Sequence, residues 1–165
     1  MQLFRLRARA LLALALIVPA LALVAIPTAL GASSTAERRH VIMIPDSDRF
    51  VPYHLTIHVG DRVTWINNDT DNHTVVSDDA FNTEGHHGIN HLILGTDNNG
   101  GRPGIFKLTF RKAGTFVYFC RFHAHLDAEK QPVAPGPDGG IQDAKGNFGT
   151  PMTGIISVIG GDDDD

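Results

Sequence analysis

The chain has 165 residues, of which 42% are hydrophobic, 19% charged and 7% aromatic, and its formal net charge is −4. This length suits one ordinary domain plus a leader or a tail, and the composition argues against a disordered chain and a multi-span membrane protein. The acidic balance excludes the basic face that a nucleic-acid-binding protein needs, so no nucleic acid is expected as a partner.

The amino-terminal segment combines positive charge with an apolar run. Three arginines precede residue 10, residues 10–36 carry no charge, and small residues stand at positions 29, 31 and 32. This pattern predicts that residues 1–32 are a signal peptide. The alternative is an uncleaved membrane anchor, because residues 10–30 are long enough to span a bilayer. Both predict an extracytoplasmic protein, in the periplasm or at the cell surface, either secreted or attached to the membrane through residues 10–30.

A short polar linker (33–39) leads into a series of strand-sized apolar segments. Apolar and polar residues alternate most clearly in residues 51–59, where Leu55 and Ile57 share one face and His54 and His58 the other. Turn residues divide these segments, and about seven or eight short strands of this kind predict an all-β protein with a β-sandwich fold. The predicted strands are residues 40–44, 51–59, 62–67, 74–77, 105–110, 115–120 and 154–159.

Two long connections interrupt the predicted domain, which spans residues 40–160. Residues 81–104 are rich in Gly, Asn and His, and residues 124–150 are rich in Pro and Gly with little periodicity. Both are predicted to be long loops. The chain then closes with a strand and an acidic tail (161–165), which is predicted to be disordered and solvated.

A single cysteine limits the chemistry. Cys120 excludes an intramolecular disulfide, a four-cysteine zinc or iron–sulfur site and a copper centre bridged by two thiolates. Side chains that can bind a metal occur in three places: at His73, in the run from Cys120 through His123 to His125, and at Met152. A soft thiolate, two imidazoles and a thioether are the donors of a mononuclear blue copper site.

Five ordered sequence pieces resemble cupredoxins of the plastocyanin and amicyanin kind. The resemblance covers about residues 40–160, and it implies a Greek-key β-sandwich with one type 1 copper ion at one end. It also implies a non-enzymatic protein that carries single electrons between redox partners, such as a cytochrome or a membrane oxidase or reductase. The pieces are VGDRVTW (59–65), NND…HTV (67–75), AGTF (113–116), YFCxxH (118–123) and PMxG (151–154).

The resemblance implies His73, Cys120, His123 and Met152 as the copper ligands. The Cys-x2-His spacing selects His123, whereas the Cys-x4-His spacing of azurin-like members would select His125 instead. Met152 arrives after residues 124–150, which are interpreted as an insertion, although the axial methionine of the family usually follows the second histidine closely.

Several alternatives remain open from the sequence. His86, His87 and His91 have a spacing that permits a second metal site in the first long connection. Copper handling is a second function, and a single-domain copper enzyme with an open coordination position is a third. We also expect both long connections to lie near the copper end and to determine which partner docks.

Overall fold

The structure, a computed structural model, describes residues 37–77 and 89–160. The predicted signal peptide or anchor (1–32), the first part of the linker, His86, His87 and the acidic tail lie outside the described residues. Within the described residues, no helix is long and apolar enough to cross a membrane.

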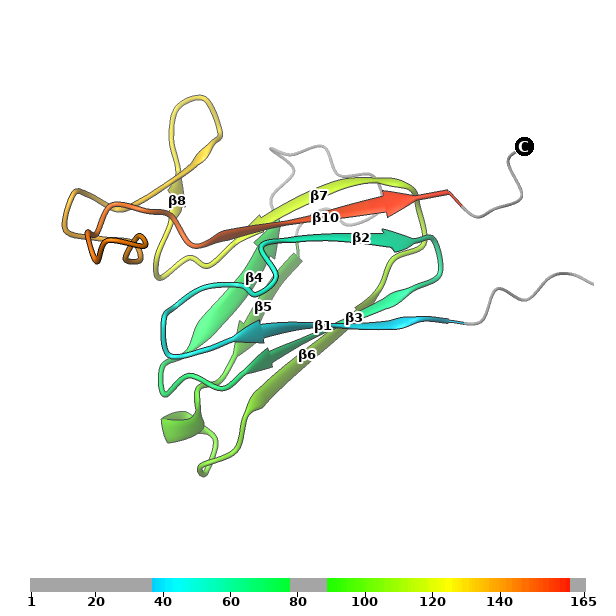
Figure 1. The fold of residues 1–165 in the computed structure, drawn as a ribbon, viewed down its shortest axis with the longest axis horizontal. Coiled ribbons are helices and arrows are strands. Elements are labelled where there is room, and N and C mark those ends of the chain that lie inside the picture. Colours follow the sequence, from blue (N-terminus) through cyan, green and yellow to red (C-terminus); the bar gives the residue numbers. More distant parts are fainter. Residues whose placement is uncertain (1–36, 78–88, 161–165) are drawn as a thin grey trace, which may run out of the picture. The chain divides into compact units, whose positions relative to one another are not determined.

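Eight strands of the described chain form two sheets (Figure 1). In the three-stranded sheet, β1 runs parallel to β3, and β3 runs antiparallel to β6. In the five-stranded sheet the order is β2-β10-β7-β4-β5. Neighbouring strands are mostly not consecutive in the sequence, because the chain crosses between the sheets, as in a Greek-key sandwich. The strands are β1 (Arg39–Ile44), β2 (His54–His58), β3 (Arg62–Asn67), β4 (His73–Ser77), β5 (Ile89–Ile93), β6 (Gly104–Thr109), β7 (Gly114–Phe119) and β10 (Thr153–Ile159).

One hydrophobic core joins the two sheets. Burial alternates along β3, where Val63 and Trp65 point inward, and along β10, where Ile156 and Val158 do so. Trp65 lies edge-on to Tyr118 of β7, with ring centroids 5.6 Å apart. The two sheets and the buried core that they share confirm the predicted β-sandwich, in which the apolar faces of the sheets pack against each other.

The prediction of one long loop over residues 81–104 is wrong in part. Residues Ile89–Ile93 form β5, which pairs antiparallel with β4, and Thr96–Asn98 form a short 3₁₀ helix. The hydrophobic pattern of the sequence did not indicate this strand, because β5 is an edge strand in which only Ile93 is buried while His91 and Leu92 are exposed. The His91 ring stacks on Phe106 of β6, with centroids 4.0 Å apart.

The strand predicted for residues 51–59 begins later than expected. Val51 forms an isolated bridge with Met43 of β1, and β2 starts only at His54. His54 is exposed, and its Nε2 lies 2.9 Å from the Ser157 hydroxyl of β10.

The insertion over residues 124–150 contains little regular structure. Its first part forms a two-stranded hairpin of β8 (His125–Leu126) and β9 (Pro132–Val133). Its last part returns to the sandwich through a bridge between Ile141 and Thr150, and Ile141 is buried in the core. Figure 1 shows this insertion at the end of the sandwich where β1 ends and β10 begins.

Candidate metal centre

A turn organised by Asn67 positions His73. The Asn67 side chain is fully buried at the end of β3, where its amide donates hydrogen bonds to the carbonyls of Asp71 (2.8 Å) and Ile93 (3.2 Å). Its oxygen accepts a hydrogen bond from the Asp69 N–H at 3.0 Å. This buried amide fixes the irregular segment of residues 67–72. His73, the first residue of β4, is therefore held in a defined position.

Cys120 follows β7 directly and is held by its neighbours. Its N–H donates to the Met152 carbonyl at 3.0 Å, and its sulfur accepts a hydrogen bond from the Thr74 N–H at 3.4 Å. The Thr74 hydroxyl in turn accepts a hydrogen bond from the Arg121 N–H at 2.9 Å. These contacts tie the segment after β7 to the start of β4 and to the residue that precedes β10.

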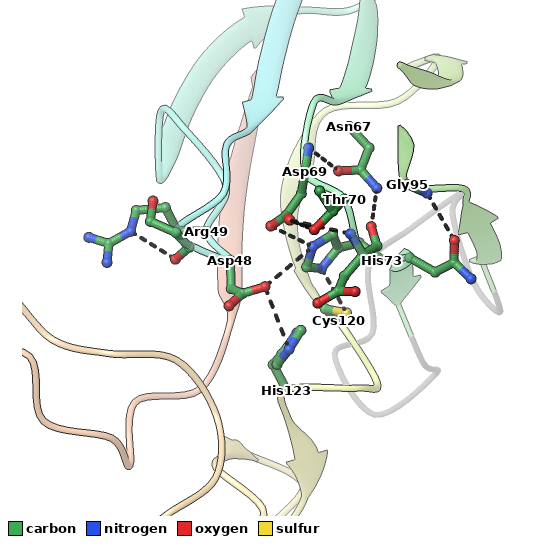
Figure 2. Close-up of polar contacts among 12 residues, drawn as sticks. Asp48, Arg49, Asn67, Asp69, Thr70, His73, Gly95, Cys120 and His123 are labelled. Carbon is green, nitrogen blue, oxygen red and sulfur yellow. Dashed lines mark hydrogen bonds and ion pairs between the residues drawn. The ribbon is translucent and has the colours of Figure 1, made fainter. Parts of the chain in front are cut away.

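Three of the predicted ligands converge. The His73 Nδ1 lies 3.6 Å from the Cys120 sulfur, and the potential ligand atoms of His73, Cys120 and His123 all lie within 4.8 Å of one another. The centroids of the His73 and His123 rings are 5.2 Å apart, and Figure 2 shows both rings beside Cys120. His73 and Cys120 are fully buried, whereas the His123 side chain keeps 20% of its surface exposed.

These groups shift one another's pKa values. Burial alone would raise the pKa of the Cys120 thiol, but the two histidines and the backbone N–H groups of Thr74 and Phe122 lower it from 9.0 to about 6. Burial lowers the pKa of His73, yet Cys120, Asp69 and Asp48 outweigh this and the net shift is upward. Cys120 is also the largest cause of the raised pKa of His123. The metal-free site therefore favours a thiolate beside imidazoles, and a thiolate is the form that binds metal.

Two carboxylates face the outer nitrogen of His73. Asp69 Oδ2 lies 3.3 Å and Asp48 Oδ1 lies 3.5 Å from His73 Nε2. Asp69 stands four residues before His73 and was visible in the sequence as part of the NND piece, whereas no signal marked Asp48. The ligand-capable atoms of Asp48, Asp69 and His73 form a second group within 4.8 Å. It shares His73 with the first group, and Asp69 also accepts hydrogen bonds from the Asp71 N–H and the Thr70 hydroxyl.

Met152 and the alternative ligand His125 lie in contrasting surroundings. Met152 is fully buried in the same core cluster as Cys120, and its N–H faces the His123 carbonyl at 3.4 Å. The insertion therefore leaves Met152 next to both residues in the backbone network. His125 is exposed on β8, where it pairs with Val133, and it is not in the cluster of His73, Cys120 and His123.

The residues present suit a copper ion. Thiolate sulfur and imidazole nitrogen are the donors that copper prefers among the first-row metals. The His123 Nδ1 is buried and makes no hydrogen bond of good geometry in the described chain. A buried polar atom without a partner is costly, and a metal bound between His73, Cys120 and His123 would remove that cost.

Several solved structures are similar to this chain at low sequence identity. An oxidised amicyanin variant is 21% identical, with a TM-score of 0.46, over 73% of this chain and 81% of that chain. A purple cupredoxin from Nitrosopumilus maritimus is 22% identical, with a TM-score of 0.45, over 73% of this chain and 99% of that chain. Amicyanin from Paracoccus versutus is 18% identical, with a TM-score of 0.44, over 78% and 87%. No curated protein sequence matches the chain.

A β-sandwich with a Cys/His group at one end defines a copper protein of the electron-transfer type. The model of the copper-binding proteins of the plastocyanin/azurin family matches residues 44–129, which is more than half of the chain. The chain therefore belongs to the plastocyanin/azurin family, the cupredoxins, and its cofactor is copper. The matched range contains His73, Cys120, His123 and His125 but ends before Met152.

Proposed function

We propose that this protein carries single electrons on one type 1 copper ion held by His73, Cys120 and His123, with Met152 as a weak axial ligand. The observation that carries the proposal is the convergence of one cysteine sulfur and two imidazoles within 4.8 Å. Its copper would supply the one-electron chemistry by alternating between Cu(I) and Cu(II). The protein's own residues supply the thiolate, hold the donors in place and exclude water.

The rigidity of the surroundings supports an electron carrier. His73 and Cys120 have no exposed surface, and hydrogen bonds through Asn67 and Thr74 fix the segments that bear them. A donor set held in this way changes little between two metal charge states, so electron exchange needs little reorganisation. Fast exchange with a partner depends on this property.

One edge of the site faces solvent. His123 is the partly exposed member of the group, and the neighbouring Phe122 is 54% exposed. A partner that covers this surface comes closest to the buried sulfur through the His123 ring. We expect electrons to enter and leave there.

Spectroscopy of single-site variants tests the ligand set. The Cu(II)-loaded protein should show intense visible absorption from thiolate-to-copper charge transfer and a small copper hyperfine splitting. Cys120→Ser should abolish the colour, because a hydroxyl is a hard and weak donor to copper. His123→Ala should disrupt the site, and the matched control His125→Ala should leave it intact. Colour that survives Cys120→Ser refutes the proposal, and a site lost only in His125→Ala selects the longer spacing.

The retention of copper by the protein distinguishes electron carriage from copper handling. A carrier should retain its copper through repeated cycles of oxidation and reduction. Copper that leaves readily to a Cu(I) chelator would instead indicate handling. Turnover of a small substrate by the loaded protein would indicate an enzyme with an open coordination position.

We propose further that the chain is exported and works outside the cytoplasm. The basic start and the apolar segment of residues 10–30 support export, with cleavage after about residue 32. Expression of the full chain in its native host, followed by fractionation and amino-terminal sequencing, tests this. A mature protein that starts near residue 33 indicates a signal peptide, an intact membrane-bound chain indicates an anchor, and an intact cytoplasmic chain refutes export.

A further inference from the structure

Asp48 lies in the turn between β1 and β2, at the metal end of the sandwich, and backbone contacts before and after it fix this turn. Its N–H donates to the Pro45 carbonyl at 3.1 Å, and its backbone has φ of 55°. Two residues later Phe50 is buried in the core, and Val51 then exchanges two backbone hydrogen bonds with Met43. These contacts therefore fix the backbone of the turn that carries Asp48.

The Asp48 carboxylate lies between the outer edges of both imidazoles. Its Oδ1 is 3.5 Å from His73 Nε2 and 3.7 Å from His123 Nε2 (Figure 2). On His73 the opposite nitrogen, Nδ1, faces the Cys120 sulfur, and on His123 the buried Nδ1 has no hydrogen-bond partner in the described chain. Both rings thus turn Nε2 toward Asp48 and leave Nδ1 for the metal.

Asp48 matters most for His123. His73 has a second carboxylate neighbour in Asp69, which is nearly fully buried. Among the described residues, Asp48 is the carboxylate within ion-pair distance of His123. Groups that contact the far nitrogen of a metal-bound histidine set the orientation of the ring and increase its donor strength.

We propose that Asp48 is a positioning residue that orients the His123 ring toward the metal and lowers the reduction potential of the site. The inference rests on the proposed function, because it requires copper on His73 and His123. A negative charge beside both imidazoles stabilises the more positive Cu(II) state relative to Cu(I). Asp48 keeps 33% of its side chain exposed, so solvent screens part of this effect.

Asp48→Asn is the decisive substitution. Asparagine has the same shape without the charge, and it tolerates a positive φ as well as aspartate does. We expect it to retain the copper colour and to shift the one-electron equilibrium toward Cu(I) by about tenfold, which corresponds to about 59 mV in midpoint potential. Asp46→Asn is the matched control, because Asp46 is an exposed acid of the same turn. Its potential should stay that of the unmodified protein.

A measurement on the metal-free protein gives an independent readout. NMR or a crystal structure of metal-free Asp48→Asn should show the His123 ring in more than one orientation, whereas Asp46→Asn keeps a single one. Asp48→Glu should recover part of the potential and of the ring order. Equal potentials and equal ring order in both asparagine variants would overturn the inference while leaving the copper site itself established.

Two further outcomes separate this inference from its alternatives. If the unmodified protein shows no thiolate–copper absorption, the proposed function fails and the inference fails with it. Titration of the copper-loaded protein with Zn²⁺ tests whether Asp48, Asp69 and His73 bind a second cation. Uptake of an added equivalent that Asp48→Asn abolishes would make Asp48 a metal ligand and refute its positioning role.

Discussion

At the residue scale, Met152 connects the insertion to the site. Its side chain is fully buried, and its backbone contacts both Cys120 and His123. We expect Met152→Leu to retain copper, because leucine has a similar volume, and to raise the reduction potential, because a thioether that donates to Cu(II) is lost. Voltammetry of the loaded protein measures this shift. Met43→Leu, a half-buried methionine of β1, is the control, and an unchanged potential in Met152→Leu would show that Met152 is not a ligand.

Asp61, which directly precedes β3, is a buried carboxylate at the opposite end of the sandwich from the metal site. Burial acts to raise its pKa, but hydrogen bonds from the His58 N–H (3.0 Å), the His40 ring (2.9 Å) and the Arg38 N–H (3.1 Å) lower it below 3.8. A carboxyl group with a lowered pKa stabilises the folded state at pH values above its ordinary pKa. This contribution is lost as the pH falls through the lowered pKa.

We therefore expect Asp61→Asn to reduce the free energy of unfolding by about 1–3 kcal/mol at pH 7. Below the lowered pKa the aspartate is protonated, so the difference between the two proteins should shrink there. Urea unfolding at neutral and strongly acidic pH measures both values. The exposed Asp97→Asn serves as the control, and a difference that is the same at every pH would contradict the assignment.

At the scale of elements, the connection after β5 supports the turn that carries His73. The Gly95 N–H donates to the Asn72 side chain at 2.9 Å, and the Thr96 N–H donates to the Asp69 carbonyl at 2.8 Å. A Cβ on Gly95 would collide with the Thr70 carbonyl oxygen. The close approach of these two backbones therefore requires glycine at this position.

Gly95→Ala should displace the turn of residues 67–72 and with it His73. We expect copper affinity to fall by about 10- to 100-fold, as for the loss of other groups that orient metal ligands. Competition with a chelator measures the affinity. Gly136→Ala is the matched control, because a Cβ there meets no atom within 4 Å. Equal affinities in the two variants would show that the turn does not orient His73.

Residues of the insertion are expected to contribute unequally to the stability of the fold. Ile141 is only 7% exposed and belongs to the core cluster that contains Met152, whereas Phe148 is 51% exposed. Ile141→Ala should lower the free energy of unfolding by about 2 kcal/mol or more, although it lies in a segment that reads as a loop. Phe148→Ala should change it by less than about 0.5 kcal/mol. Chemical denaturation of both variants checks the order, and a reversed order would place the core contact elsewhere.

At the scale of the whole molecule, the sandwich gathers distant segments at one end. The turn after β1, the segment after β7 and the residues before β10 meet around His123. The insertion starts there with Ala124, which packs on Val76 and Phe119 of the five-stranded sheet. A partner that approaches the His123 edge therefore meets the insertion, whose exposed acids include Glu129 and Asp138.

Removing these two charges tests whether the insertion guides a basic partner. We expect the variant that combines Glu129→Gln and Asp138→Asn to exchange electrons with a basic cytochrome about two- to fivefold more slowly at low ionic strength. The difference should vanish at high salt, because salt screens exposed charges. Stopped-flow rates at several salt concentrations measure it. Glu37→Gln removes an acid next to Arg62, at the opposite ends of the strands, and should leave the rate unchanged. Equal rates for all three proteins would remove the insertion from docking.

The sequence alone predicted the fold class and the kinds of donor atom at the site. Strand-sized apolar segments between turn residues located seven of the eight strands of the two sheets, and period-2 alternation, where it occurs, reports which residues of a strand share a face. The donor types at Cys120, the histidines and Met152 are chemical properties of single residues and suit copper, and the resemblance to cupredoxins implied one copper ion. The exposed edge strand β5 was missed because its stability comes from pairing with β4 rather than from its own pattern.

The tertiary structure decided the rest. Both His123 and His125 fitted a known spacing, and the path of the chain puts His123 beside Cys120 while His125 lies exposed on β8. Asp48 is 25 residues from His73 in the sequence, and the turn after β1 brings its carboxylate within 3.7 Å of both imidazoles. Contacts of this kind depend on where the backbone places a side chain in space, and a one-dimensional pattern does not encode that position.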